Sequence, residues 1–249
     1  MKTFAVNLKR ESLKKEHILA ECKRHELDVE VIDAVEGALL SDLELKELVY
    51  DYPNCYLTKG EIGCVLSHLS IYKRMIAEGL DYALILEDDA IITSNSIKTI
   101  LGEIPSIDDG KDNVWLLSDV EAYVENKKSI TKSGYIFHKA ERAYCTHGYI
   151  LNRKAAKKMI SISTPIKFEA DRWQNFYQNY WLNVYCLVPH IISTNDMDKS
   201  HSTIEIDRKS LELKRRKYRN KIKKRSLRYW LYRNIRKFFV IKNEIVIEK

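Results

Sequence analysis

Apolar residues follow two different spacings along the first two thirds of the chain, and these spacings alternate. Short apolar or alternating runs predict strands, whereas apolar residues that recur every three or four positions predict helices. We expect strands over 3–8, 29–35, 82–86, 113–119, 143–151 and 183–189, and helices over 11–25, 41–50, 59–78 and 152–160. Strands that alternate with helices predict an α/β domain with a mixed, largely parallel sheet flanked by helices.

Two of the predicted helices begin with a recognisable cap. Ser41 and Thr58 each precede a glutamate by three positions, which is the spacing of a capping box. The second helix also carries Gly60 and Gly63 in its first turns. These glycines permit either the close approach of a ligand or the close packing of the helix start, and the sequence leaves both readings open.

Three consecutive carboxylates, Glu87, Asp88 and Asp89, follow the apolar run 82–86. In open α/β sheets ligands bind at the carboxyl ends of strands, which is where this triplet lies. Adjacent carboxylates repel one another, and a divalent cation with oxygen ligands, Mg²⁺ or Mn²⁺, would compensate for that repulsion. Such a cation would neutralise a diphosphate leaving group. The alternative is a solvated turn with lysines nearby.

The composition of the chain is that of a soluble globular protein, with 249 residues, of which 45% are hydrophobic and 31% charged. Its five cysteines are scattered and never spaced as CxxC. This argues against a disulfide framework or a structural zinc site and favours a reducing compartment. The N-terminal segment lacks the apolar core of a signal peptide, and no apolar run approaches the roughly 18 residues of a membrane span. We therefore expect a cytoplasmic protein.

Charge is distributed unevenly between two parts of the chain. Residues 208–249 contain 17 Lys/Arg and 3 Asp/Glu, a net charge of +14, whereas residues 1–207 carry −7. An acidic body with a strongly basic tail indicates different roles for the two parts. We accordingly expect one domain over 1–207 and a basic amphipathic helical tail over 208–249.

An apolar stripe runs through the basic tail. Leu227, Leu231, Ile235 and Phe239 recur every four residues, with basic residues on either side. This pattern predicts a helix that lies on an anionic membrane surface, where each basic residue contributes about 1 kcal/mol. Nucleic acid, a weaker candidate partner, and a solvated helix without a partner are the two alternatives.

Four elements appear in a characteristic order. They are Val6-Asn7-Leu8 with Arg10, the "GEIGC" of residues 60–64 followed by Ser67 and His68, the "LEDD" of residues 86–89, and "CTHGYILNRKAA" over residues 145–156. Together they resemble family 25 glycosyltransferases, which include bacterial lipooligosaccharide galactosyltransferases and collagen-type galactosyltransferases. Cys145 stands where a glycine or another small residue is common. The resemblance covers roughly residues 3–200 and leaves the tail outside.

The resemblance implies a GT-A-like fold, a UDP-sugar donor (most often UDP-galactose), a Mn²⁺ or Mg²⁺ cofactor and an inverting transfer. Carried over to this sequence, Asp89 is the principal metal ligand. Glu87 contacts the ribose or the metal, and Asp88 supports them. His201 is a further candidate metal ligand, because enzymes of this fold often take one from a late loop.

Residues for the nucleotide follow from the same resemblance. Val6, Asn7 and Asp33 lie where strand ends hold a uridine. Lys59 or Arg10 would meet the phosphates, since cationic side chains pair well with them. His147, one residue before a glycine in a strand–turn, is expected to contact the donor or the acceptor.

An inverting transfer needs a general base near the acceptor hydroxyl, usually a carboxylate. The stretch "FEADRWQ" offers Asp171, which we favour, and Glu169; it resembles a short acidic segment that family members carry there. Asp171 also fits as the N-cap of the helix beginning "RWQNFY". His68, on a predicted helix, reads more readily as a packed histidine behind the site than as a ligand.

The sequence therefore predicts a hexosyltransferase, galactose being the first choice of sugar, that uses a UDP-hexose and a lipid-linked oligosaccharide acceptor of lipooligosaccharide or lipopolysaccharide. We expect it on the cytoplasmic face of the inner membrane, held peripherally by its tail. One alternative is a metal-dependent phosphoryl-transfer enzyme or nuclease that uses the same triplet. The other is a non-enzymatic module that binds membrane or RNA.

Overall fold

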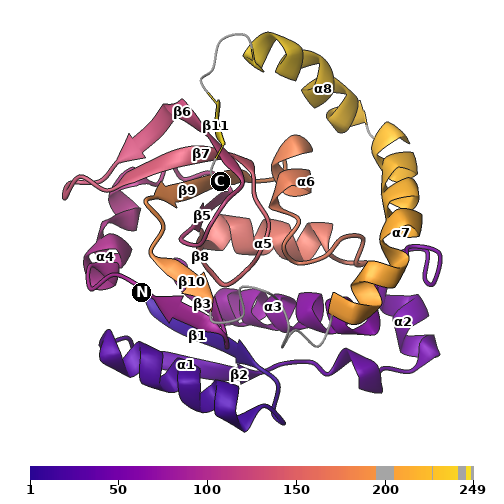
Figure 1. Cartoon of the computed structure of the whole chain (residues 1–249), viewed down its shortest axis with the longest axis horizontal. Helices are drawn as coiled ribbons and strands as arrows, with labels where there is room; N and C mark the ends of the chain where they lie inside the picture. Colours follow the sequence, from indigo (N-terminus) through magenta and orange to yellow (C-terminus); the bar gives the residue numbers. More distant parts are fainter. Residues whose placement is uncertain (195–204, 226, 241–244, 248–249) are drawn as a thin grey trace.

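The structure is a computed structural model that describes residues 1–194, 205–225, 227–240 and 245–247 (Figure 1). Within these residues one large sheet has the strand order β11-β6-β7-β9-β5-β8-β3-β1-β2. Its strands are β1 (Lys2–Asn7), β2 (Val29–Asp33), β3 (Tyr82–Glu87), β5 (Asn113–Leu116), β6 (Ala122–Ile130), β7 (Ile136–Arg142), β8 (Gly148–Asn152), β9 (Asn183–Val188) and β11 (Ile245–Ile247). A separate two-stranded ladder joins β4 (Ala90–Ile92) to β10 (Ile192–Thr194).

The large sheet is mixed. Strand β1 pairs in parallel with β2 and β3, and β5 pairs in parallel with β9. Strand β8 lies antiparallel between β3 and β5, and the β6–β7 end of the sheet is also antiparallel. The predicted mixed α/β sheet is confirmed, with its parallel pairing concentrated around β1, where the predicted site lies.

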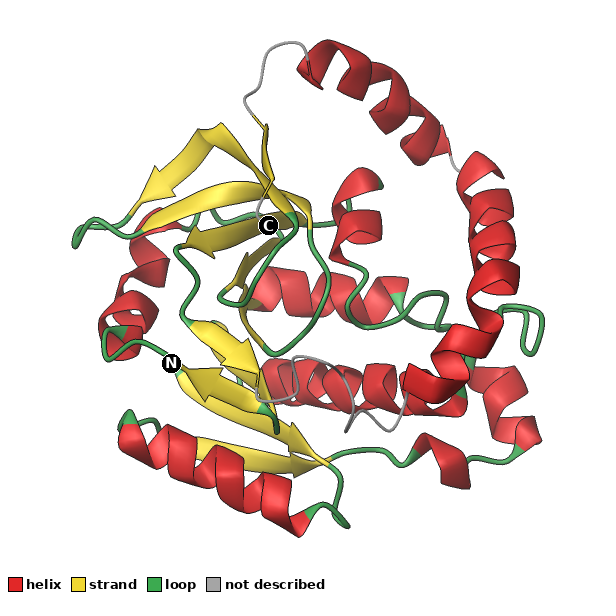
Figure 2. Ribbon diagram, in the orientation of Figure 1, coloured by secondary structure: helices red, strands yellow, loops and turns green. Residues whose placement is uncertain are grey.

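Helices cover both faces of this sheet (Figure 2). They are α1 (Ser12–Arg24), α2 (Asp42–Leu48), α3 (Lys59–Ala77), α4 (Ile97–Ile107), α5 (Arg153–Ile162), α6 (Trp173–Gln178), α7 (Glu205–Arg225) and α8 (Leu227–Val240), with a short 3-10 turn η1 (Gly37–Leu39). Buried residues of α3, α5 and α6 pack on one face, where they meet Phe4 and Ile85. Buried residues of α1 and α4 pack on the other, where they meet Ala5 and Leu84. Alternate residues of each strand therefore enter two different cores.

The start of α3 is fixed by two local features. Both predicted capping boxes are present, at Ser41 for α2 and at Thr58 for α3. A Cβ atom added to Gly63 would lie only 2.4 Å from the backbone oxygen of Val35. Gly63 thus allows the start of the helix to pack closely against the segment that follows β2. Of the two readings left open by the sequence, ligand approach and helix packing, the structure supports packing for Gly63.

Some elements differ from their predicted extents. The strand expected over 143–151 begins only at Gly148, because Cys145 adopts a left-handed conformation with φ of 72° and the chain before it is a loop. The β6–β7 hairpin and α4 were not predicted. Polar residues interrupt the apolar pattern of β6. In α4 the buried Ile97, Ile100, Leu101 and Ile104 recur at helical spacing, a signal that could have predicted this helix.

Each described element of the basic tail contacts the body. Arg215 of α7 binds Glu61 of α3, Tyr232 of α8 meets the ring of Tyr177 edge-on, and β11 pairs with β6. Figure 1 shows α7 and α8 running along one side of the molecule. The boundary expected at residue 208 falls inside α7. Among the described helices, none has both the length and the apolar content required to cross a bilayer.

Candidate active site

The carboxyl ends of three neighbouring strands meet at one edge of the sheet. In the parallel register Val6 lies opposite Glu87, and Asn7 lies opposite Asp33. Residues Leu84 to Leu86 of β3 are fully buried, whereas Glu87 is partly exposed at the strand end. The acidic triplet therefore projects from the core into the region where ligands bind in sheets of this kind.

Glu87, Asp89 and His147 form a compact cluster. The Nδ1 atom of His147 lies 3.2 Å from Glu87 Oε2 and 3.3 Å from Asp89 Oδ1. The loop before β8 delivers His147, whose backbone oxygen accepts a hydrogen bond from the Glu87 amide at 3.1 Å. Two hydroxyls complete the cluster: Thr194 donates to Asp89 Oδ2 at 2.9 Å, and Thr146 donates to Glu87.

The electrostatics of the cluster favour a cation between the two carboxylates. Burial lowers the pKa of His147, but contacts with Asp89, Cys145 and Glu87 outweigh burial and raise it far above its ordinary value. Burial raises the pKa of Glu87, but the neighbouring His147 and His68 side chains prevail and hold it well below its usual range. Protonated His147 thus supplies positive charge between the side chains of Glu87 and Asp89.

The donor set of this cluster fits a divalent metal. The candidate ligand atoms of Glu87, Asp89 and His147 all lie within 4.8 Å of one another. Two carboxylates and an imidazole nitrogen suit Mn²⁺, and carboxylates suit Mg²⁺. A metal bound here would replace the proton on His147, because a ligating imidazole is neutral.

Asp88 is not one of the three grouped side chains and contacts Asn7 instead. Its Oδ2 atom accepts a hydrogen bond from Asn7 Nδ2 at 2.8 Å. Burial, reinforced by repulsion from Asp89 and Glu87, raises the pKa of Asp88 to about 6 against the opposing effects of Lys14 and Asn7. Asn7 therefore acts at this site by holding the Asp88 carboxylate.

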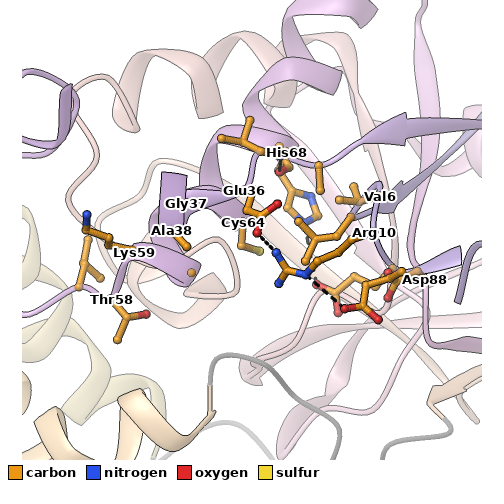
Figure 3. Close-up of a pocket in the computed structure, with 18 of the residues that line it drawn as sticks. Val6, Arg10, Glu36, Gly37, Ala38, Thr58, Lys59, Cys64, His68 and Asp88 are labelled. Atoms are coloured by element: carbon orange, nitrogen blue, oxygen red, sulfur yellow. Dashed lines mark hydrogen bonds and ion pairs between the residues drawn. The ribbon is translucent and has the colours of Figure 1, made fainter. Parts of the chain in front are cut away.

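A cavity of about 620 Å³ opens beside the triplet. Of the residues predicted from the sequence, its lining includes Val6, Arg10, Lys59, Glu87, Asp88 and Asp89. Figure 3 shows Arg10 beside Glu36, with which it forms an ion pair, and Glu11 lies 3.5 Å from the Arg10 Nε atom. Ser210 and Leu211 of α7 also line the cavity, so the tail contributes to its wall.

Lys59 and Asp33, two of the nucleotide-binding candidates, differ in their relation to this cavity. The Nζ atom of Lys59 donates to the Leu40 backbone oxygen at 2.8 Å, and Figure 3 places Lys59 well away from Asp88. Asp33 is exposed and is not part of the lining; Ala34 and Val35, the next residues, line the cavity instead. Arg10 is consequently the better placed of the two cations suggested for the phosphates.

The structure does not bring the two base candidates into the cavity lining. Glu169 is 2% exposed, and its carboxylate pairs with Arg172 at 3.2 Å, Arg215 at 3.4 Å and Arg219 at 2.8 Å. These ion pairs hold Glu169 among three arginines. The expected N-cap role of Asp171 is wrong, because α6 starts at Trp173 with Arg172 as its N-cap. His201 lies outside the described residues.

His68 matches the packed position expected for it, although it also touches the site. It is 1% exposed, its Nδ1 atom lies 2.7 Å from the Tyr149 hydroxyl, and its Nε2 atom lies 3.9 Å from Glu87 Oε1. Sequence reasoning missed Thr146 and Thr194. Thr146 adjoins His147 in the quoted "CTHGY" stretch and could have been found there, whereas Thr194 reaches Asp89 only through the β4–β10 pairing.

The chain belongs to glycosyltransferase family 25. The model of this family, described as "Glycosyltransferase family 25 (LPS biosynthesis protein)", matches residues 1–173. The chain is 28% identical to human procollagen galactosyltransferase 2 in an alignment of 174 residues that covers 63% of this chain and 27% of that protein. It is 29% identical to human "Inactive glycosyltransferase 25 family member 3" in an alignment of 180 residues that covers 66% of this chain and 29% of the relative. The chain thus spans less than a third of the length of these curated relatives.

Two solved structures are similar at low identity. A glycosyltransferase involved in glycosylation of the major capsid of PBCV-1 has a TM-score of 0.34 and 10% identity, over 85% of this chain and 98% of that one. A putative glucose-1-phosphate thymidylyltransferase from Bacillus anthracis, in complex with a sucrose, has a TM-score of 0.42 and 14% identity, over 86% of this chain and 95% of that one.

Proposed function

We propose that this chain is a metal-dependent glycosyltransferase that transfers a hexose from a UDP-sugar, with inversion, to a lipid-linked glycan of lipooligosaccharide or lipopolysaccharide. Galactose is the first sugar to test, because curated relatives are named as galactosyltransferases. The observation that carries the proposal is the Glu87–Asp89–His147 cluster beside a cavity of about 620 Å³, at the carboxyl ends of parallel strands.

In this proposal Glu87, Asp89 and His147 hold Mn²⁺ or Mg²⁺. The metal, when bound, supplies positive charge that makes the diphosphate a better leaving group. Thr194 and Thr146 hold the two carboxylates in position through their hydroxyls. Arg10 and the start of α3, which both line the cavity, add positive potential for an anionic donor.

The general base remains a separate part of the proposal. Three arginines engage Glu169, so Asp171 is the residue that we retain for proton removal from the acceptor hydroxyl. Asp171 precedes α6, whose Trp173 indole donates to the Cys145 backbone oxygen at 2.8 Å. That contact ties the Asp171 segment to the loop that carries His147, and this supports a role for Asp171 on the acceptor side of the site. The variant Asp171→Asn tests that role.

The second part of the proposal is that α8 attaches the chain to a membrane. We propose the cytoplasmic face of the inner membrane as the location. Leu227, Trp230, Leu231 and Ile235 are exposed on α8, and the tail is strongly basic. We expect the chain to sediment with vesicles containing anionic phospholipid and not with neutral ones. Replacing Trp230 and Leu231 by serine should abolish sedimentation. The control variant Leu13→Ser, which replaces an exposed leucine of α1, should sediment normally. Equal binding to neutral vesicles would contradict this part.

A turnover assay tests the proposal as a whole. The purified chain is incubated with Mn²⁺ and, separately, UDP-galactose or UDP-glucose, with lipooligosaccharide as acceptor, and release of UDP is measured. We expect acceptor-dependent release that is lost on metal chelation and in Asp89→Asn. Nucleic-acid hydrolysis without sugar transfer would instead support a phosphoryl-transfer enzyme. One relative is named as inactive, which makes an inactive chain the alternative that this assay must exclude. Absence of turnover with both donors would contradict the enzymatic proposal.

A further inference from the structure

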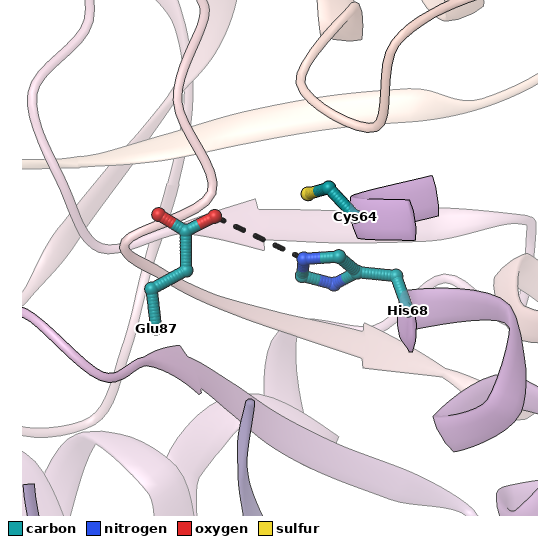
Figure 4. Close-up of side chains that lie close together, drawn as sticks. All are labelled: Cys64, His68 and Glu87. Carbon is teal, nitrogen blue, oxygen red and sulfur yellow. Dashed lines mark ion pairs between the residues drawn. The ribbon is translucent and has the colours of Figure 1, made fainter. Parts of the chain in front are cut away.

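Cys64, His68 and Glu87 form a second cluster of potential metal ligands on the wall of the same cavity (Figure 4). Cys64 and His68 are four residues apart on α3, so both side chains leave the same face of the helix. Glu87 reaches them from the end of β3, with its Oε1 atom 3.9 Å from His68 Nε2. The three candidate ligand atoms all lie within 4.8 Å of one another.

The Nε2 atom of His68 is buried, and within the described part of the chain it has no hydrogen-bond partner. The other ring nitrogen, Nδ1, lies 2.7 Å from the Tyr149 hydroxyl, which lies 2.6 Å from the Tyr72 hydroxyl. When Nδ1 carries the proton, it donates to Tyr149, and Tyr149 donates to Tyr72. Nε2 then presents a lone pair toward Cys64 and Glu87. Metal-binding histidines show this arrangement, with the second nitrogen fixed by an outer hydrogen bond.

The chemistry of the donors selects the kind of ion. A thiolate, an imidazole and a carboxylate are all ligands of Zn²⁺, whereas Mg²⁺ takes oxygen ligands. Zinc bonds of about 2.0–2.3 Å in a tetrahedral site place ligand atoms roughly 3.3–3.7 Å apart. The 3.9 Å between His68 Nε2 and Glu87 Oε1 is close to that spacing. Three protein ligands beside a cavity also leave a fourth position open.

We propose that Cys64, His68 and Glu87 form a binding site for Zn²⁺ or another thiophilic divalent ion, distinct from the Glu87–Asp89–His147 cluster. The two clusters share Glu87. An ion bound by Cys64 and His68 therefore draws Glu87 away from His147 and Thr146, which contact it in the structure. Occupancy of one site weakens the other, and zinc acts as an inhibitor of the activity proposed above; this last step rests on the proposed function.

Cobalt binding tests the site without any assay of activity. The metal-free full chain is titrated with Co²⁺, and the thiolate-to-cobalt charge-transfer absorption is recorded. We expect this absorption to saturate at one Co²⁺ per chain. Equimolar Zn²⁺ should displace the cobalt and remove the absorption, whereas a hundredfold excess of Mg²⁺ should leave it unchanged. Cys64→Ser should remove the absorption, and His68→Gln should weaken Co²⁺ binding at least tenfold.

Two matched variants separate this cluster from its neighbour. The thiol of Cys145 contacts His147 and is an alternative sulfur ligand beside the other cluster. Cys145→Ser should therefore retain the absorption. His147→Ala removes a ligand of the other cluster only, and should retain the absorption too. Unchanged unfolding temperatures of the Cys64→Ser and Cys145→Ser variants would exclude a folding defect.

The proposal is overturned when Co²⁺ gives no thiolate absorption, when Cys64→Ser retains it, or when Cys145→Ser removes it. The link to activity has its own readout. Zinc should inhibit UDP release by the wild type at least tenfold more strongly than by Cys64→Ser, each compared with its own zinc-free rate. Loss of turnover in every preparation would contradict the proposed function and leave the cobalt result to decide the metal site.

Discussion

Arg215 ties the tail to the body through a buried ion-pair network that can be tested quantitatively. The residue is 2% exposed, and one of its guanidinium nitrogens lies 2.6 Å from Glu61 Oε1 and 3.4 Å from Glu169 Oε1. Its Nε atom donates to the Tyr56 backbone oxygen at 3.0 Å. Arg215→Met keeps much of the buried volume but leaves two buried carboxylates with fewer cationic partners.

The expected cost follows from what each carboxylate retains. Removing one partner of a buried ion pair costs about 3–5 kcal/mol. Glu169 keeps Arg219 and Arg172, and Glu61 keeps its cap hydrogen bond with Thr58. We therefore place the loss of unfolding free energy at the lower end, about 3 kcal/mol. For a chain of this size that corresponds to a fall in Tm of about 6–12 °C.

Urea unfolding of the wild type and of Arg215→Met measures this loss directly. Arg216→Met is the matched control, because Arg216 is exposed on the same helix and should cost less than about 0.5 kcal/mol. A double-mutant cycle with Glu61→Gln isolates the coupling between Arg215 and Glu61. A loss below about 1 kcal/mol in Arg215→Met, or equal losses in both arginine variants, would refute the reasoning.

Three further predictions concern packing and burial. Gly63→Ala should destabilise the chain by more than 2 kcal/mol in urea unfolding, on the order of an overpacked core, because a Cβ there would lie 2.4 Å from the Val35 oxygen. Gly102→Ala, in α4 with nothing within 4 Å of the new atom, should stabilise by about 0.5–1 kcal/mol; a loss would contradict the open space. Burial, with a smaller effect of Glu21, raises the pKa of Cys22 to about 12, so its thiol stays protonated at pH 8 and should resist alkylation until the chain unfolds. Mass spectrometry reads this out, and modification of folded protein at the rate of a small thiol would count against it.

How far the sequence predicted the site depended on the range of the interactions involved. Capping boxes at Ser41 and Thr58 are local patterns of four residues, and both are present. The strand that ends at Glu87 was also predicted, because its apolar run is short and bounded by charge. His147 was expected to contact the donor or the acceptor, but its position between Glu87 and Asp89 depends on the antiparallel pairing of β8 with β3, which no local pattern specifies.

Contacts between distant segments likewise determine the surroundings of two other candidates. Glu169 looked like a candidate base in isolation, and only the fold brings Arg215 and Arg219 of α7 to its carboxylate. Lys59 looked like a phosphate ligand, yet its amino group is held by the Leu40 backbone oxygen, 19 residues away in the chain. The contribution of Ser210 and Leu211 to the cavity wall likewise requires α7 to dock, which its charge-rich sequence does not indicate.

The central claim is that the Glu87–Asp89–His147 cluster binds a divalent ion and, with it, a uridine diphosphate. Thermal unfolding of the full chain with UDP, Mn²⁺, both or neither tests it most directly. Asp89→Asn is compared with the wild type, and Asp81→Asn, at an exposed position before β3, is the matched control. A ligand at a hundred times its Kd adds about 2.7 kcal/mol, or roughly 5–11 °C in Tm for a chain of this size. We predict a shift of this size in the wild type and Asp81→Asn that requires both UDP and Mn²⁺ and is absent in Asp89→Asn. A shift that persists in Asp89→Asn, or no shift under any combination, would contradict the claim.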